Sequence, residues 1–154
     1  MERHVVIGRR LPRVDGMPLV TGAATYTTDV VLPRMLYGKI LRSPHPHARI
    51  LGINVDRASR LTGVRGIITG RDTLGRVFGL YPDEPGMAVD KVRYLGEAVA
   101  AVAADDEDVV EESLHLIDVE YEPLPAVYDP LEAMAPGAPL IHEALGTNIS
   151  MSPT

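Results

Sequence analysis

The sequence predicts an α+β protein with a mixed sheet and a few short helices. Segments with a strand pattern recur along most of the chain, and one clear amphipathic helix follows the most apolar of them. The 154 residues include 13 prolines and 14 glycines, so many turns are expected and a helical bundle is not. With 45% hydrophobic residues the chain can bury a core, and its length fits one domain with a small appendage.

Strand patterns occur in six segments. They are residues 37–42, 48–55, 64–69, 92–94, 98–104 and 119–121. Residues 98–104 are all Ala or Val, and such a short, wholly apolar run suits a buried central strand that is built to be covered. Asp56 is expected to cap a short helix over 57–61, and Asp129 and Pro130 are expected to open another that ends at Met134.

The clearest helix is expected over residues 106–117. Asp105 is the expected N-cap, and the acidic residues that follow it favour the positive end of the helix dipole. One face carries Val109, Val110, Leu114 and Ile117. Because a strand pattern flanks the helix on each side, we expect a βαβ unit, which would be right-handed if its two strands are parallel.

The chain is expected to have three parts. Residues 1–35 contain turn signals and little regular structure, residues 36–134 hold the strands and helices, and residues 135–154, rich in proline and glycine, are expected to form an extended tail. The N-terminal stretch lacks the long apolar run of a signal peptide, and no segment is apolar enough to span a membrane.

Composition excludes several kinds of site and partner. The formal net charge is −6 and no cluster of lysine or arginine forms a basic stripe, so neither nucleic acid nor an anionic membrane is an expected partner. The chain has no cysteine, which excludes disulfides, thiolate zinc sites and cysteine-ligated iron–sulfur clusters within it and is compatible with a cytoplasmic location. Neither a phosphate-binding glycine loop, nor a dinucleotide-binding fingerprint, nor a hydrolase serine elbow is present.

Three groups of residues could carry function, and each has a simpler interpretation. His45 and His47 could face one metal from an extended segment, but no third ligand is near in sequence, so polar groups on a surface turn are favoured. The acidic run at 105–112 is expected to be the solvated start of a helix rather than an acid–base pair. Leu80 and Tyr81 place apolar surface on a turn-rich loop, where they either pack on their own domain, the favoured interpretation, or face another surface.

Five stretches in order carry a family resemblance. They are residues 7–16, 20–29, 41–50, 90–100 and 119–126, including Leu-Arg-Ser-Pro-His-Pro-His-Ala-Arg-Ile at 41–50 and Val-Arg-Tyr-Leu-Gly-Glu-Ala-Val at 92–99. In this order and spacing they resemble the start of the molybdenum-binding large subunit of the xanthine dehydrogenase and aldehyde oxidase family. Within that family the sequence most resembles the large subunit of bacterial 4-hydroxybenzoyl-CoA reductase.

The resemblance implies a fold, a cofactor and a set of partners. The fold is the α/β hammerhead, and the cofactor of the complete enzyme is molybdenum on a molybdopterin, in bacteria usually the cytosine dinucleotide form. Electrons pass through 2Fe-2S clusters and FAD on partner domains or subunits. The catalytic and cofactor-binding residues lie in the molybdopterin-binding region that follows the hammerhead, so none is assigned here.

The resemblance also gives Leu80 and Tyr81 a role. The matching loop approaches the channel that leads substrate to the metal, so these two residues become candidates for lining it. A second interpretation of the chain is a non-catalytic hammerhead that serves assembly or interaction. An unrelated small α+β binding domain would require the five ordered matches to be coincidental.

Overall fold

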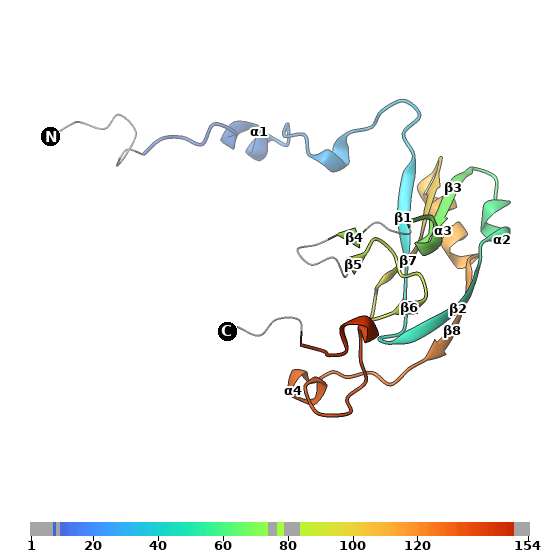
Figure 1. Ribbon diagram of the computed structural model, residues 1–154. Coiled ribbons are helices and arrows are strands. Elements are labelled where there is room, and N and C mark those ends of the chain that lie inside the picture. The colour runs from blue at the N-terminus through green and yellow to red at the C-terminus, as the bar shows by residue number, and fades with distance from the viewer. Residues whose placement is uncertain (1–7, 9, 74–76, 79–83, 150–154) are drawn as a thin grey trace. The chain divides into compact units, whose positions relative to one another are not determined.

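The computed structural model describes residues 8, 10–73, 77–78 and 84–149 (Figure 1). The chain divides into two compact units, Met1–Met35 and Leu36–Thr154. The first unit contains the helix α1, Gly16–Thr21, and the 3-10 helix η1, Thr27–Asp29. A short helix therefore forms where we expected only turns. It ends at Gly22, whose φ of +73° provides the left-handed residue that commonly closes a helix.

The second unit contains the remaining elements. In chain order they are β1 (Tyr37–Arg42), β2 (Ala48–Asn54), α2 (Asp56–Ser59), β3 (Val64–Thr69), η2 (Gly70–Thr73), β4 (Val77–Phe78), β5 (Glu84–Pro85), β6 (Lys91–Val92), β7 (Ala98–Ala104), α3 (Glu107–His115), β8 (Asp118–Pro123), α4 (Pro130–Ala133) and η3 (Glu143–Leu145). The α+β class is confirmed. The strands expected at 37–42, 64–69 and 98–104 form with those bounds.

The strands form three small sheets. Their orders are β1-β7-β3, β6-β2-β8 and β4-β5, and every strand pair among the described residues is antiparallel. As expected, β7 is the central strand of the first sheet. The expected βαβ unit is wrong, because α3 joins β7 in the first sheet to β8 in the second. Since β1 and β3 occupy both edges of β7, β8 pairs with β2 instead.

The helix α3 begins one residue later than expected. Its N-cap is Asp106, whose side chain accepts a hydrogen bond from the Asp108 backbone N–H at 2.8 Å. Asp105 still follows the course of β7, because its backbone N–H donates to the Gly63 carbonyl at 3.0 Å, while its carboxylate binds Arg65. The cap at Asp129 forms as expected, with its side chain accepting from the backbone N–H groups of Leu131 and Glu132.

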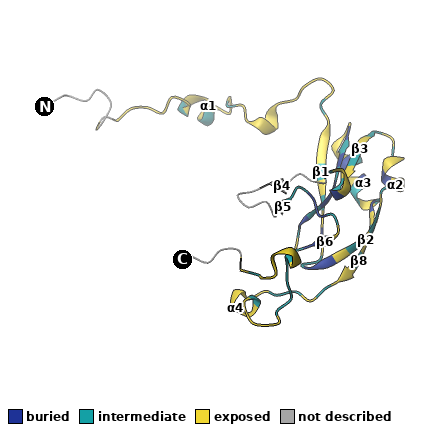
Figure 2. Ribbon diagram, in the orientation of Figure 1, coloured by how far each residue is buried: buried dark blue, intermediate teal, exposed yellow. Residues whose placement is uncertain are grey.

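The core lies between α3 and one face of the first sheet and continues toward β2 and β8 (Figure 2). Its buried members are mostly small. They include Ala58, Ala100, Val102, Ala104, Val110 and Ile117, with a second group of Ala48, Ala88, Val92 and Val99. Small side chains let these short elements pack closely. In the part of the chain that the structure describes, no helix is both long and apolar enough to cross a membrane.

The segment after α4, for which we expected an extended tail, forms turns and η3. The side chain of Asn148 holds it together. Its amide nitrogen donates to the carbonyls of Ala133 and Pro139 at 3.0 and 2.9 Å, and its amide oxygen accepts from the Ile141 backbone N–H at 2.9 Å. One side chain thus replaces the hydrogen bonds that a regular element would supply.

Candidate functional site

Leu80 and Tyr81, the candidate channel residues, lie outside the described residues, but the base of their loop is described. Strands β4 and β5 pair antiparallel, with Val77 opposite Pro85 and Phe78 opposite Glu84. Residues 79–83 therefore connect the two strands of a hairpin. The position of that hairpin is set by the residues on either side of it.

The hairpin is followed by a tightly packed anchor. Met87 and Ala88 are buried, and the Ala88 backbone N–H donates to the Ala98 carbonyl at the start of β7, at 2.8 Å. Gly70 packs directly against this segment, since a Cβ built on it would lie 2.1 Å from the Ala88 carbonyl oxygen. Only glycine permits so close an approach of two backbones. The first sheet thus fixes the chain that leaves the loop.

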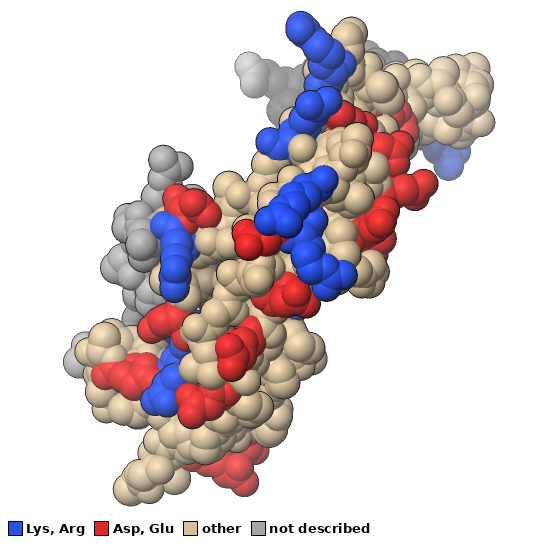
Figure 3. Space-filling model, turned by 90° about the vertical axis from the view of Figure 1, so that its right-hand side faces the viewer, with Lys and Arg blue, Asp and Glu red and all other residues tan. Residues whose placement is uncertain are grey.

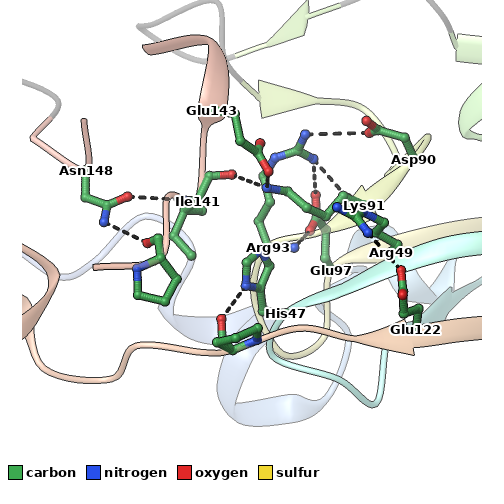
Figure 4. Close-up of polar contacts among 12 residues, drawn as sticks. His47, Arg49, Asp90, Lys91, Arg93, Glu97, Glu122, Ile141, Glu143 and Asn148 are labelled. Atoms are coloured by element: carbon green, nitrogen blue, oxygen red, sulfur yellow. Dashed lines mark hydrogen bonds and ion pairs between the residues drawn. The ribbon is translucent and has the colours of Figure 1, made fainter. Parts of the chain in front are cut away.

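Beside this anchor lies a group of charged residues that we call the polar cluster (Figure 4). It consists of the buried Lys91 and Glu97 and the half-buried Arg93. The Lys91 side chain is only 5% exposed, and its ammonium group donates to the Ile141 carbonyl and to Glu143, each at 2.7 Å. This ion pair lowers the pKa of Glu143. A buried cation without such partners would be costly, so these contacts fix the segment after α4 against β6.

Glu97 and Arg93 form the other half of the polar cluster. The Arg93 backbone N–H donates to the Glu97 carboxylate, and the Arg93 guanidinium lies 3.8 Å from that carboxylate and donates to the Lys91 carbonyl at 2.9 Å. Burial raises the pKa of Glu97, although the hydrogen bond from the Arg93 N–H and the Arg93 charge both act to lower it. A carboxyl with a raised pKa can mark a catalytic group, but this one is occupied by hydrogen bonds inside its own turn.

The two histidines do not face a common ligand. His47 is buried rather than on the surface, and its Nδ1 lies 2.6 Å from the Pro125 carbonyl oxygen, so Nδ1 carries the proton and donates. The His45 ring instead contacts the Tyr121 ring edge-on, with 4.9 Å between centroids. Among the described residues, no group of three or more His, Cys, Asp or Glu could hold a metal ion.

The acidic residues around the start of α3 are exposed, and three of them are paired with cations. Lys39 on β1 lies 2.7 Å from Glu111 and 3.4 Å from Glu107, and Arg65 on β3 binds Asp105. Acidic and basic side chains are interspersed over the side of the molecule seen in Figure 3. These contacts agree with a solvated helix face rather than an acid–base pair.

A hollow of about 320 Å³ lies between β2 and β3, with η2 and Val89 completing its wall. Its polar residues are Thr69, Arg71 and Asp72, and the Asp72 carboxylate accepts hydrogen bonds from the Thr69 backbone N–H and hydroxyl. These two bonds lower the pKa of Asp72. The Thr69 hydroxyl thus donates to a carboxylate whose lowered pKa makes it a weak base, so this pair gives little support for hydrolytic chemistry.

Comparison with known proteins assigns this arrangement to a family. Residues 21–125 match the family described as aldehyde oxidase and xanthine dehydrogenase, a/b hammerhead domain. The chain belongs to this family. The α/β hammerhead fold expected from the sequence is thereby confirmed.

Two relatives and one solved structure illustrate the match. The chain is 44% identical over 133 residues to a probable xanthine dehydrogenase subunit of Bacillus subtilis, and the match covers 85% of this chain and 18% of that protein. It is 36% identical over 144 residues to the nicotinate dehydrogenase large molybdopterin subunit of Eubacterium barkeri, covering 90% of this chain and 33% of that protein. A crystal structure of Cu,Mo-CO dehydrogenase aligns with a TM-score of 0.82 and 38% identity, over 86% of this chain and 17% of that one. The aligned part of this chain thus spans a third or less of each of these proteins.

The described residues of the hammerhead do not fit a molybdopterin. The buried side-chain atoms without a hydrogen-bond partner among them are His47 Nε2 and Arg93 Nε, and neither residue lines the hollow between β2 and β3. Of the buried charges, Lys91 holds the segment after α4 and Glu97 accepts a hydrogen bond within its own turn. The anchor around Ala88 and the polar cluster therefore fix two segments of chain. One is the hairpin of β4 and β5, whose connection includes Leu80 and Tyr81, and the other is the segment at 135–149.

Reasoning from the sequence missed the polar cluster. Lys91 and Glu143 are 52 residues apart, and no periodicity links them. One signal was present, because Lys91, Arg93 and Glu97 all fall in the stretch 90–100 that carries the family resemblance.

Proposed function

We propose that this chain is the N-terminal structural and substrate-channel domain of the large subunit of a molybdenum-dependent hydroxylase or dehydrogenase. The observation that carries the proposal is the hammerhead match over residues 21–125, together with the pairing of β4 with β5 on either side of residues 79–83 in the sequence. The catalytic centre lies in a region outside residues 1–154, and the chain alone is inactive. Leu80 and Tyr81 line the route by which substrate reaches that centre.

The complete enzyme carries molybdopterin, in the cytosine dinucleotide form, with 2Fe-2S clusters and FAD on partner domains or subunits. The names of the relatives support the first part, since one is a large molybdopterin subunit and another a Cu,Mo enzyme. The cytosine form, the clusters and the flavin rest on the sequence resemblance, as does the assignment to the 4-hydroxybenzoyl-CoA reductase type. A cytoplasmic location is proposed because the chain contains no cysteine that would indicate an oxidising compartment.

The first experiment is to isolate the chain with its bound partners from cells that produce it and to measure molybdenum, iron and flavin. Release of cytidine monophosphate on acid hydrolysis would identify the cytosine dinucleotide. We expect molybdenum and a molybdopterin-binding region to accompany the chain. Its isolation without either would contradict the proposal and favour the non-catalytic assembly module.

The channel role is tested in the complete enzyme by Leu80→Ala and Tyr81→Ala. Loss of apolar contacts to a passing or bound substrate should change KM by about threefold or more, or alter the order of preference among substrates. Leu51→Ala is the matched control, because Leu51 is an exposed leucine on β2, 55% accessible, away from the hairpin. Kinetics equal to those of the control would remove the channel role and leave the family assignment intact.

A further inference from the structure

One face of the first sheet is covered by α3, and the described residues cover the other only at the end where Val99 packs against Ala88 and Val92. Leu41, Ile67 and Val102 point toward the core beneath α3. The residues that alternate with them point to the other side, because successive side chains of a strand face opposite ways. Six of these form what we call the open face: Gly38 and Ile40 on β1, Ala101 and Ala103 on β7, and Gly66 and Ile68 on β3.

The strand register places these six residues in two rows. Ile40 pairs with Ala101, which pairs with Ile68, and the neighbouring row is Gly38, Ala103 and Gly66. Ile40 and Ile68 are 44% and 45% exposed. A Cβ built on Gly66 would meet nothing within 4 Å, and one on Gly38 would touch only the Val102 carbonyl of its own sheet, at 3.7 Å. The two isoleucines and the two glycines are therefore left uncovered by the described part of the chain.

This composition does not suit a face that stays in water. An antiparallel sheet with one solvated face normally carries polar residues on that side. Here all six residues are apolar or glycine, whereas the opposite side of the same strands bears Lys39 in its ion pairs. Gly66 follows a register irregularity in β3, which glycine often marks, but Gly38 lies in a regular part of β1, and glycine within a strand also marks the close approach of another backbone. Exposed apolar patches of this kind mark interfaces.

The length of the relatives indicates what covers the open face. The chain aligns with 18% of the Bacillus subtilis relative and 17% of the Cu,Mo-CO dehydrogenase chain, so most of each polypeptide lies outside the hammerhead. A region joined to the hammerhead in one polypeptide meets it at a high effective concentration. We propose that the open face is the docking surface for the remainder of the large subunit, which places an apolar element across Ile40, Ala101 and Ile68. The docking surface itself follows from the sheet, and only the identification of the covering element as part of the large subunit rests on the proposed function.

The test uses the absence of cysteine from residues 1–154. Ile68→Cys and the control Leu51→Cys each place a single thiol in this part of the chain, at sites that are 45% and 55% exposed. In the complete protein, isolated with its partners, a maleimide should label position 68 about tenfold more slowly than position 51, since a covered thiol reacts only when the interface opens. Equal labelling overturns the proposal.

A photo-crosslinker attached at Ile68→Cys identifies the occupant by mass spectrometry. Crosslinks to large-subunit peptides outside residues 1–154 support the proposal. Crosslinks to residues 1–35 or to a second copy of this chain overturn it. Molybdenum content measured on the same samples separates the docking surface from the proposed function as part of a molybdenum enzyme. An accessible position 68 in a molybdenum-loaded enzyme refutes the docking surface alone, whereas a protected position 68 in a protein without molybdenum refutes only the proposed function.

A second variant tests close packing at the glycine row. Gly66→Gln adds a side chain where this chain leaves open space, and Gly52→Gln does the same on β2, where a Cβ also meets nothing within 4 Å. We expect Gly66→Gln to reduce the yield of assembled enzyme at least about threefold relative to Gly52→Gln, because over-packing an interface destabilises it. Equal yields of the two variants would overturn the proposal that another backbone packs closely against Gly66.

Discussion

Gly70→Ala should strongly destabilise the anchor below the candidate channel loop. The new methyl group would lie 2.1 Å from the Ala88 carbonyl oxygen and 2.9 Å from the Val89 Cα, so backbone rather than a flexible side chain must move. Over-packing costs about 1–3 kcal/mol, and a clash with backbone belongs at the upper end. Alanine recovers about 0.4–1 kcal/mol by restricting the unfolded chain. The expected net loss is about 2 kcal/mol, which corresponds to a fall in Tm of roughly 4–8 °C for a protein of this size.

The assay is thermal unfolding of the chain followed by circular dichroism, with Gly52→Ala as the matched control. A Cβ at Gly52 meets nothing within 4 Å, so that substitution should leave Tm nearly unchanged or slightly higher. Hydrogen exchange at the Ala88 N–H, which is bonded to the Ala98 carbonyl, should accelerate in Gly70→Ala. A Tm for Gly70→Ala equal to that of Gly52→Ala would refute the argument that this contact fixes the loop.

Three further outcomes follow from the caps and the polar cluster. Asp106→Ala should lower the free energy of unfolding by about 1 kcal/mol in urea titrations, because Asp106 is the N-cap of α3. Asp105→Ala should have a smaller effect, and a larger effect of Asp105→Ala would contradict Asp106 as the cap. Lys91→Met should lower the free energy of unfolding by about 1–2 kcal/mol, because it leaves the Ile141 carbonyl without its hydrogen-bond donor. It should also accelerate hydrogen exchange in residues 139–149, and unchanged exchange there would show that other contacts hold the segment. Because burial raises the pKa of Glu97, the folded state holds its proton more tightly, so the free energy of unfolding should decrease as pH rises from the ordinary carboxyl pKa through the raised one. Glu97→Gln should abolish this decrease in urea titrations between about pH 4 and 7, and parallel pH profiles would count against it.

Local patterns predicted the elements better than their pairing. The strands at 37–42, 64–69 and 98–104 each contain an apolar run closed by a turn residue or a change to polar residues, and all three form as expected. The partner of β8 was not predictable in this way. It depends on both edges of β7 being occupied, and that follows from long-range pairing rather than from residues 119–121 themselves.

The N-cap and the polar cluster show two further limits of the sequence. Asp105 and Asp106 are equally good capping residues by type, and the choice between them depends on Arg65 and Gly63, about 40 positions earlier. Lys91 reads as an ordinary surface lysine until Ile141 and Glu143 close over it. The candidate channel role of Leu80 and Tyr81 came from family resemblance, and it stays a prediction.

The Asn148 side chain also bears on where the protein tolerates insertion. Its three hydrogen bonds hold Ala133, Pro139 and Ile141, so the exposed turn at Pro136 and Gly137 is fixed at both ends without contributing to any of the three sheets. Lengthening a loop with fixed ends costs only about 0.6 kcal/mol for each doubling of its length. This turn is therefore a place where a peptide tag or a fluorescent label can be carried while the strands, the hairpin anchor and the polar cluster keep their geometry.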